Sequence, residues 1–214
     1  MTKEGMTMSD AQRIVFIGDS ITEWGRFEDK ENLGVNYVRI IHDYLKVTYP
    51  EKQLQIINKG IGGDRVTNLV ERWEEDVIAQ NPDIVSISVG INDVWRQLDG
   101  SPVEQVYPEQ FEALYDDILA QLKTKTNAQI IIMEPTVMAE DIEAEGNKML
   151  VPYVEAVRRL AEKYETLLVP THDAFLDYLR KGDYPLTIDG VHMNPAGNML
   201  MAKTWLNTVG HLFE

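Results

Sequence analysis

The sequence of 214 residues contains no cysteine. Without a thiol it can form no disulfide, thiolate zinc site or iron–sulfur cluster, and it has no cysteine nucleophile. Positive charge is also scarce, because 20 Lys and Arg stand against 35 Asp and Glu, for a formal net charge of −15. Nucleic acid and anionic membranes repel an acidic surface, so we expect neither as a partner.

Long apolar runs are absent as well. The run Ile14–Ile17 is far shorter than the roughly 20 residues that cross a bilayer. Residues 1–10 are polar and lack the apolar centre of a secretory signal, so we expect a cytoplasmic protein with a flexible N-terminus. The length favours a single domain over residues 1–214, and 44% hydrophobic with 26% charged residues is typical of a globular chain.

Short apolar runs alternate with longer helical patterns along the whole chain. The runs are rich in Ile and Val and are predicted to be buried strands: Ile14–Ile17, Leu54–Ile57, Ile84–Val89, Ile130–Met133 and Leu167–Val169. The helical patterns cover Tyr37–Val47, Leu69–Ala79, Pro108–Lys125, Leu150–Tyr164 and Ala196–Val209. Such alternation predicts an α/β fold with a five-stranded parallel sheet. The acidic stretch Met138–Lys148 is predicted to be a surface loop, which leaves open whether it acts as a lid.

Four glycine-containing segments with polar side chains follow predicted strands. In an open parallel sheet, the loops beyond the carboxyl ends of the strands form the binding crevice. The segments are Gly18-Asp19-Ser20-Ile21-Thr22, Asn58-Lys59-Gly60-Ile61-Gly62-Gly63-Asp64, Gly90-Ile91-Asn92-Asp93 and Asp189-Gly190-Val191-His192. We therefore expect the four segments to form one candidate site.

Ser20 and His192 are the candidate nucleophile and base. A serine at a tight strand-to-helix turn needs a base to remove its proton, and Ser20 taken alone is better interpreted as a helix N-cap. Asp189, three residues before His192, can accept a hydrogen bond from the imidazole and orient it. The alternative for Asp189 is a cap of the helix that starts near Pro195. Thr22 stands where a G-x-S-x-G elbow would have its second glycine, so an α/β-hydrolase is not indicated.

Gly63 and Asn92 are candidate oxyanion donors. Acyl transfer needs hydrogen-bond donors at the tetrahedral intermediate, and the Ser20 N–H, the Gly63 N–H and the Asn92 side chain would supply three. The alternatives are an Asx turn at Asn92 and a phosphate-binding or merely flexible turn at 60–63. The latter run is neither a Walker motif nor G-x-G-x-x-G.

Together the four segments resemble the conserved blocks of an SGNH hydrolase of the GDSL esterase family, in the family's order, from residue 18 to residue 192. The first block reads Gly-Asp-Ser-Ile instead of Gly-Asp-Ser-Leu. The resemblance implies a flavodoxin-like α/β/α sandwich and ester hydrolysis through an acyl-serine, without metal or cofactor. It implies Ser20 as nucleophile, His192 as base, Asp189 as its orienting residue, and Ser20, Gly63 and Asn92 as the oxyanion hole.

A closer resemblance links residues 72–80 and 90–97 to bacterial acetylxylan esterases and related carbohydrate deacetylases. It implies removal of acetyl groups from xylo-oligosaccharides or related sugars. Those enzymes often carry an aromatic residue before the catalytic Asp, where this chain has Thr187 and Ile188. Lysophospholipase- or thioesterase-like activity and a general short-chain carboxylesterase remain alternatives, with a non-catalytic flavodoxin-like binding domain as the rival of a different class.

Aromatic and basic residues near the blocks are candidate substrate contacts. Trp24 and Trp95 each follow a block closely and can stack on the apolar face of a sugar. Arg65 and Arg96 can contact hydroxyls or acidic substituents, as can Arg26, and each is equally well explained by a surface ion pair. Trp73 and Trp205 are expected to pack within the core.

The oligomeric state is weakly indicated by the sequence. Three methionines surround the last helical pattern and are interpreted either as an apolar contact surface or as core: Met193, Met199 and Met201. With the resemblance to deacetylases, they make a homo-oligomer a reasonable expectation.

Overall fold

The computed structural model describes residues 12–214, so the predicted flexible segment 1–10 lies outside the described residues. Five parallel strands form one sheet in the order β2-β1-β3-β4-β5. They are β1 (Gln12–Gly18), β2 (Leu54–Gly60), β3 (Ile84–Ser88), β4 (Gln129–Met133) and β5 (Leu167–Val169). This confirms the predicted α/β fold and its five-stranded parallel sheet.

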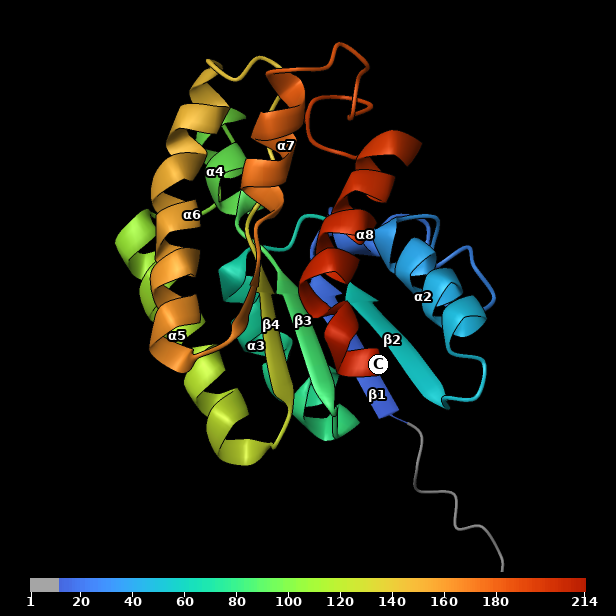
Figure 1. The fold of residues 1–214 in the computed structure, drawn as a ribbon. Coiled ribbons are helices and arrows are strands. Elements are labelled where there is room, and N and C mark those ends of the chain that lie inside the picture. Colours follow the sequence, from blue (N-terminus) through green and yellow to red (C-terminus); the bar gives the residue numbers. More distant parts are fainter. Residues whose placement is uncertain (1–11) are drawn as a thin grey trace, which may run out of the picture.

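Helices cover both faces of the sheet, as its Ile- and Val-rich strands require. They are α1 (Ser20–Glu23), α2 (Tyr37–Thr48), α3 (Val66–Asp76), α4 (Ile91–Leu98), α5 (Pro108–Lys125), α6 (Glu145–Tyr164), α7 (Thr171–Leu179) and α8 (Pro195–Val209), with 3₁₀ turns η1 (Ile78–Gln80) and η2 (Gly210–Phe213). Figure 1 shows α2 and α8 beside one another on one face, with α3 and α5 behind the sheet on the other. Every residue of β3 is buried between these layers.

The core contains two of the four tryptophans. Trp73 of α3 and Trp205 of α8 are almost fully buried, which confirms their predicted packing role. The indole N–H of Trp205 donates to the Ser86 hydroxyl at 3.0 Å, so its polar atom is satisfied inside the core. Along residues 12–214, no helix combines the length and the apolar character needed to cross a bilayer.

The acidic stretch Met138–Lys148 differs from the prediction of a surface loop. Helix α6 begins at Glu145, so the last four residues of the stretch are helical, and Met138 and Asn147 are buried. The Asn147 side chain accepts from the Met138 N–H at 2.7 Å and donates to the carbonyls of Ala139 and Asp141. These buried hydrogen bonds fix a segment whose acidic composition alone indicates solvent exposure.

The fold brings the candidate loops to one place. Strand β1 lies between β2 and β3 in the sheet, and the chain leaves β1 for one helix layer and β3 for the other. This is the topological switch point at which open parallel sheets have their crevice. The segments that follow β1, β2 and β3 therefore meet above the same edge.

Candidate active site

Ser20 is positioned by the close passage of β1 into α1. The Asp19 side chain accepts the Ile21 N–H at 2.9 Å and caps the helix, which makes Ser20 the first helical residue and not the cap. A Cβ at Gly18 would lie 2.4 Å from the Ser88 carbonyl and 2.5 Å from the Thr22 hydroxyl. Only glycine fits there, so the turn is tight and Ser20 is held at the end of the strand.

His192 lies between Ser20 and Asp189. Its Nε2 is 2.9 Å from the Ser20 Oγ, and its Nδ1 is 2.7 Å from Asp189 Oδ2. An ionised Asp189 can only accept, which assigns the imidazole proton to Nδ1 and leaves Nε2 to accept from the serine hydroxyl. The three side chains thus form a continuous hydrogen-bonded chain, although they are separated by up to 172 positions in the sequence.

The Asp189 carboxylate also organises its own turn. Its Oδ1 accepts the backbone N–H of Val191 at 3.1 Å and that of His192 at 2.8 Å. Partial burial raises the pKa of Asp189, but the hydrogen bonds from the His192 side chain and from these two N–H groups outweigh it and lower the pKa below its ordinary value. Asp189 is therefore ionised at neutral pH, as an orienting carboxylate requires. Asn194, not Asp189, caps α8, since it accepts from Ala196 and Gly197.

Gly63 and Asn92 follow β2 and β3, the two strands that flank β1. Asn92 is buried in the first turn of α4, and its Nδ2 donates to the Asp64 carbonyl at 3.0 Å. This bond uses one of the two N–H groups of the amide and leaves the other as a candidate oxyanion donor. Its partner is 28 residues away, so the side chain does not form a local Asx turn. Gly63 has a φ of 82°, and a Cβ at the preceding Gly62 would lie 3.9 Å from the Cβ of Ser20. The glycine loop therefore passes directly beside the serine.

Two partly exposed tryptophans flank the imidazole. The ring centroid of Trp24 lies 4.6 Å from that of His192, with an interplanar angle of 32°. The ring centroid of Trp95 lies 5.9 Å from that of His192, with an interplanar angle of 63°. The structure thus places both tryptophans beside His192, near the candidate site, as predicted. Such contacts limit the rotation of the imidazole and give the site aromatic walls.

The arginines differ in how they are held. Arg96 pairs with Asp99 at 2.6 Å, and its Nη2 would lie 3.4 Å from a Cβ at Gly63, so it reaches the glycine loop. Arg65 Nη1 donates to the Glu104 carbonyl at 2.5 Å. Arg26 donates to the Gly60 carbonyl at 2.6 Å. Substrate contacts by Arg65 and Arg96 stay predictions.

Three acidic side chains lie beneath the loops, and each has a structural partner. Asp19 caps α1, Asp93 accepts from the Val66 N–H at the start of α3, and Asp64 pairs with Arg72 at 2.8 Å. Burial raises the pKa of Asp19 and of Asp93 to about 7 each. Over residues 12–214, no group of three or more acidic or histidine side chains is arranged to hold a metal ion.

Arg72 is a residue that the sequence did not single out. Its guanidinium donates to the carbonyls of Gly18 and Lys59, and it also pairs with Asp64 and Asp76. It thereby joins the ends of β1 and β2 beneath the site. The only sequence signal was the i, i+4 spacing of Arg72 and Asp76 within a predicted helix.

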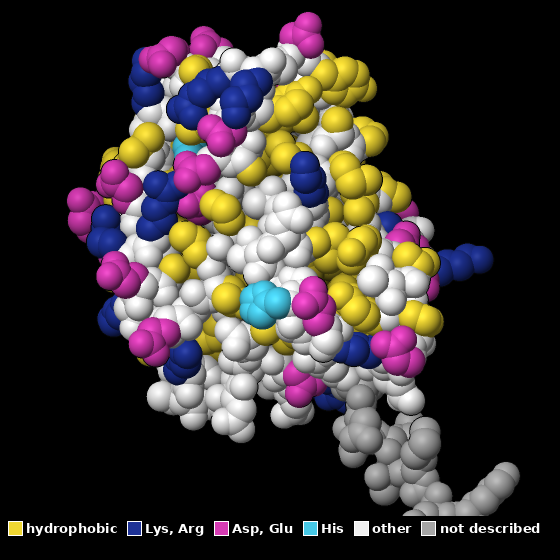
Figure 2. Space-filling view, in the orientation of Figure 1, with side chains coloured by type: hydrophobic (Ala, Val, Ile, Leu, Met, Phe, Trp, Pro, Cys, Tyr) yellow, Lys and Arg dark blue, Asp and Glu magenta, His cyan; other side chains and the backbone are white. Residues whose placement is uncertain are grey.

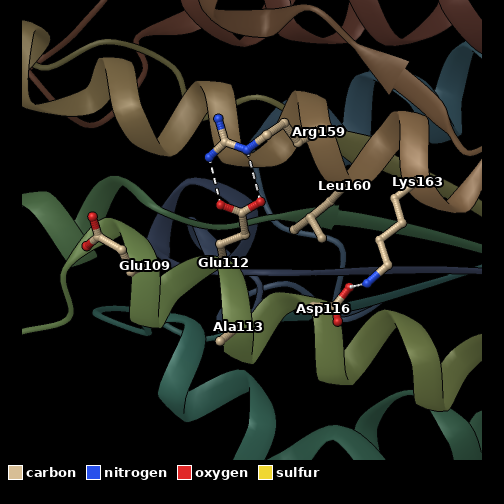
Figure 3. A pocket seen from close by; sticks show the side chains of 7 residues that line it. All are labelled: Glu109, Glu112, Ala113, Asp116, Arg159, Leu160 and Lys163. Carbon is tan, nitrogen blue, oxygen red and sulfur yellow. Dashed lines mark hydrogen bonds and ion pairs between the residues drawn. The ribbon is translucent and has the colours of Figure 1, made fainter.

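Two of the hollows on the surface differ in character. A hollow of about 240 Å³ adjoins the candidate site and is largely apolar, with Trp95, Leu98, Met138, Ala139, Ala144, Gly146, Asp189, Gly190 and Val191 lining it. A larger one of about 490 Å³ lies between α5 and α6. Figure 3 shows that two hydrogen bonds join the Arg159 guanidinium to the Glu112 carboxylate in this hollow, and that Lys163 donates to Asp116. None of the candidate site residues lines this larger hollow, whereas Trp95 and Asp189 line the first one.

Hydrophobic side chains gather beside the loop that carries His192. Figure 2 shows them at the upper right, where Figure 1 places the start of α8 and the chain before it. Tyr184 and Ile188, in the chain before α8, and Met199, in α8, have exposed side chains. Of the three methionines that surround α8, Met193 and Met201 are buried and belong to the core, and only Met199 is exposed.

Comparisons with known proteins identify relatives of this chain. The profile of the GDSL-like lipase/acylhydrolase family matches residues 16–200. An acetylxylan esterase from Geobacillus stearothermophilus is 37% identical to this chain over 96% of it and 97% of the relative.

Solved structures of esterases and hydrolases are similar to this chain as well. The crystal structure of Axe2, an acetylxylan esterase from Geobacillus stearothermophilus, superposes with a TM-score of 0.86 at 37% identity over 95% of this chain and 97% of that one. LAE5, an alpha/beta hydrolase from the metagenome of Lake Arreo, Spain, also gives a TM-score of 0.86, at 33% identity over 97% of this chain and 99% of that one.

Proposed function

Because the chain belongs to the GDSL-like lipase/acylhydrolase family and is a carboxylic ester hydrolase, we propose that it removes O-acetyl groups from xylo-oligosaccharides or related sugars through an acyl-serine intermediate. The observation that carries this proposal is the placement of His192, which is hydrogen-bonded to both Ser20 and Asp189. That arrangement gives a serine hydroxyl the base it needs to attack an ester.

In the first half of the proposed reaction, the Ser20 Oγ attacks the acetyl carbonyl carbon while His192 Nε2 takes the hydroxyl proton. Asp189 stabilises the resulting imidazolium through Nδ1. The negative charge on the carbonyl oxygen is stabilised by the backbone N–H groups of Ser20 and Gly63 and by the side-chain amide of Asn92. The tetrahedral intermediate then breaks its bond to the sugar oxygen, and His192 protonates that oxygen so that the sugar leaves as an alcohol.

In the second half, water takes the place of the sugar hydroxyl. His192 removes a proton from the water, the resulting hydroxide attacks the acetyl carbonyl, and the same three donors stabilise the second oxyanion. Collapse of this intermediate breaks the bond to the Ser20 oxygen, to which His192 returns the proton, and releases acetic acid, which ionises to acetate in solution. The aromatic contacts with Trp24 and Trp95 support the imidazole in one orientation through both halves.

The substrate class rests on the shape and polarity around the imidazole. Trp24 and Trp95 offer aromatic surface of the kind that packs against the apolar side of a sugar ring. The acetylxylan esterases among the relatives support an acetylated sugar as the ester. The apolar hollow of about 240 Å³ beside Trp95 is the observation that favours the second candidate, a general short-chain carboxylesterase, because such a hollow can also accept an apolar leaving group.

Partners and domain organisation extend the proposal. We propose one domain, because both helix layers pack on the same sheet. A formal net charge of −15 supports a neutral ester over nucleic acid or anionic lipid. The exposed side chains of Tyr184, Ile188 and Met199 support a homo-oligomer.

The decisive test compares substrates on the purified protein and on Ser20→Ala. Acetylated xylo-oligosaccharides, N-acetyl sugars and lysophospholipids are assayed side by side, and p-nitrophenyl esters of increasing chain length give the acyl preference. We expect release of acetate from the acetylated oligosaccharides, a preference for acetyl over longer acyl groups, and a loss in Ser20→Ala of about 10³-fold or more in kcat.

Circular dichroism and the Tm of Ser20→Ala provide the control for folding, since loss of one hydroxyl should leave both near the wild-type values. An optimum at C8–C12 esters would contradict the acetyl substrate. Undiminished activity of a folded Ser20→Ala protein would contradict the acyl-serine mechanism itself.

A further inference from the structure

Glu140 binds the chain that leads into the Asp189–His192 turn. One oxygen of its carboxylate, Oε1, accepts three hydrogen bonds: from the Leu186 N–H at 2.7 Å, the Thr187 N–H at 2.8 Å and the Thr187 hydroxyl at 2.9 Å. The partners are 46 and 47 positions away in the sequence. The segment after β4 is therefore attached to the segment before α8 at this point.

The attachment continues from Thr187 to the residues of the site. The Thr187 Oγ accepts the Gly190 N–H at 3.1 Å, and the Gly190 carbonyl accepts the Ala139 N–H at 2.6 Å. The Ile188 N–H donates to the His192 carbonyl at 2.8 Å. The turn that carries Asp189 and His192 is thus bound at its start by Glu140 and in its middle by Ala139.

Helix α6 fixes Glu140 from the other side. Asn147, which is buried, accepts from the Met138 N–H and donates to the carbonyls of Ala139 and Asp141. These bonds bracket Glu140 on both sides of its backbone. Ala139 has a φ of 67°, a conformation unusual for a residue other than glycine, which persists where surrounding contacts determine it.

We propose that Glu140 is a positioning residue for the hydrolytic reaction, which holds the Asp189–His192 turn at the distance from Ser20 that proton transfer requires. The inference rests on the proposed function. A shift of about 1 Å in a reacting group costs about 10²-fold in rate, and Glu140 Oε1 alone accepts three of the hydrogen bonds that hold the start of the turn. The acidic segment after β4 therefore serves as a fixed support for the base and not as a mobile lid.

The test uses kcat, KM and the pH profile for p-nitrophenyl acetate in Glu140→Ala, Glu140→Gln and Thr187→Val. Glu140→Ala should lose about 10²-fold in kcat with little change in KM. The acidic limb of kcat/KM should move to lower pH, because a less well-placed Asp189 stabilises the imidazolium less. Glu140→Gln retains an acceptor oxygen and should keep at least about a third of wild-type kcat, with Thr187→Val between the two.

Glu143→Ala is the matched control, because its side chain is 74% exposed in the same segment and contacts only Lys148 at 3.2 Å. It should match the wild type in all three measurements. A Glu140→Ala protein with wild-type kcat and pH profile would overturn the proposal, as would equal losses in Glu140→Ala and Glu140→Gln. A lower Tm with an unchanged pH profile would show a merely structural role and would also overturn it.

Thr187→Val keeps the test decisive if Glu140→Ala fails to fold, because it removes one hydroxyl and leaves the carboxylate in place. Wild-type kcat and pH profile in both Thr187→Val and Glu140→Gln would then contradict the proposal. Failure of the esterase mechanism is recognised separately, by activity in Ser20→Ala; loss of activity there together with an unaffected Glu140→Ala contradicts only the role of Glu140.

Discussion

At the scale of single residues, the site is built over buried acids whose charge is costly. Asp19 and Asp93 lie beneath the loops with almost no contact with water. Burial raises the pKa of each to about 7; one backbone N–H bonded to each carboxylate opposes this rise, and Arg65 opposes it at Asp93. Each acid also raises the cost of ionising its neighbours: Asp64 acts on Asp19, and Asp19 acts on Asp93.

These raised pKa values predict a stability that falls as pH rises. Below about pH 4 the Asp93 carboxyl is protonated in the folded and the unfolded chain. Between about pH 4 and 7 the unfolded chain releases the proton and the folded chain keeps it, so the free energy of unfolding decreases until about pH 7 and then levels.

Asp93→Asn should remove this dependence at one position. The amide oxygen can still accept the Val66 N–H, while the neutral side chain no longer opposes folding at high pH. We expect the decrease in Tm between pH 5 and pH 8 to be smaller than in the wild type by about 5–10 °C, which corresponds to about 2–3 kcal/mol. Asp177→Asn, at an exposed position, is the control and should not alter the change of Tm with pH. A slope unchanged in Asp93→Asn would contradict the buried-acid account.

At the scale of elements, one buried asparagine connects α1 with α2. Asn36 caps α2 by accepting from Val38 and Arg39, and its amide donates to the carbonyls of Thr22, Trp24 and Leu33. Asn58 at the end of β2 donates to two of the same carbonyls, those of Thr22 and Leu33. The chain between Ser20 and α2, with Trp24 in it, is therefore held from two elements at once.

Asn36→Ala should be among the more destabilising polar substitutions. It removes an N-cap, which is worth about 1 kcal/mol, and it removes a donor from buried carbonyls at about 1–3 kcal/mol. We expect a loss of about 2–4 kcal/mol in the free energy of unfolding, measured by urea denaturation. Asn194→Ala provides the comparison, because this cap of α8 is only partly buried and should cost about 1 kcal/mol. Equal losses in the two variants would show that capping alone accounts for the effect.

The elements also show which parts of the structure can be predicted from sequence. Short apolar runs rich in Ile and Val identify all five strands, and periodicity identifies the five longer helices. The four residues of α1 and the eight of α4 are too short to show a period, so they were not predicted as helices. Helix α3 is shifted, since it starts at Val66 and ends at Asp76, with the 3₁₀ turn Ile78–Gln80 after it.

Some residues of the candidate site could likewise be predicted from the sequence, and others could not. Ser20, Gly63 and Asn92 could be placed together because parallel strands end at one edge of a sheet. Asp189 and His192 were recognised by their spacing and by the family blocks. Arg72, Glu140 and Asn147 were not recognised, because their partners are backbone groups of distant segments, which carry no signal in the side-chain pattern. Roles that depend on tertiary hydrogen bonds to the main chain need the fold.

At the scale of the whole molecule, the net negative charge and the arginines near the site act on an anionic substrate in opposite directions. The formal net charge of −15 repels anions at long range. Near the site, Arg26, Arg65 and Arg96 are bound through carbonyls or, for Arg96, through Asp99, so two of the three keep their positive charge without a carboxylate partner in direct contact. Ionic strength separates these effects, because the Debye length falls from about 30 Å at 0.01 M salt to about 10 Å at 0.1 M.

We therefore predict different salt responses for a neutral and an anionic ester of the same leaving group. For p-nitrophenyl acetate, kcat/KM should change by less than about 2-fold between about 0.01 and 0.1 M NaCl, because a neutral molecule is not steered by the field. For the p-nitrophenyl monoester of succinate, kcat/KM should start lower and rise about 3-fold or more, since salt screens the repulsion by the net charge. A stopped-flow or plate assay at fixed pH measures both. If kcat/KM for the succinate ester falls with salt, the arginines at the site, and not the net charge, determine how charged substrates approach Ser20.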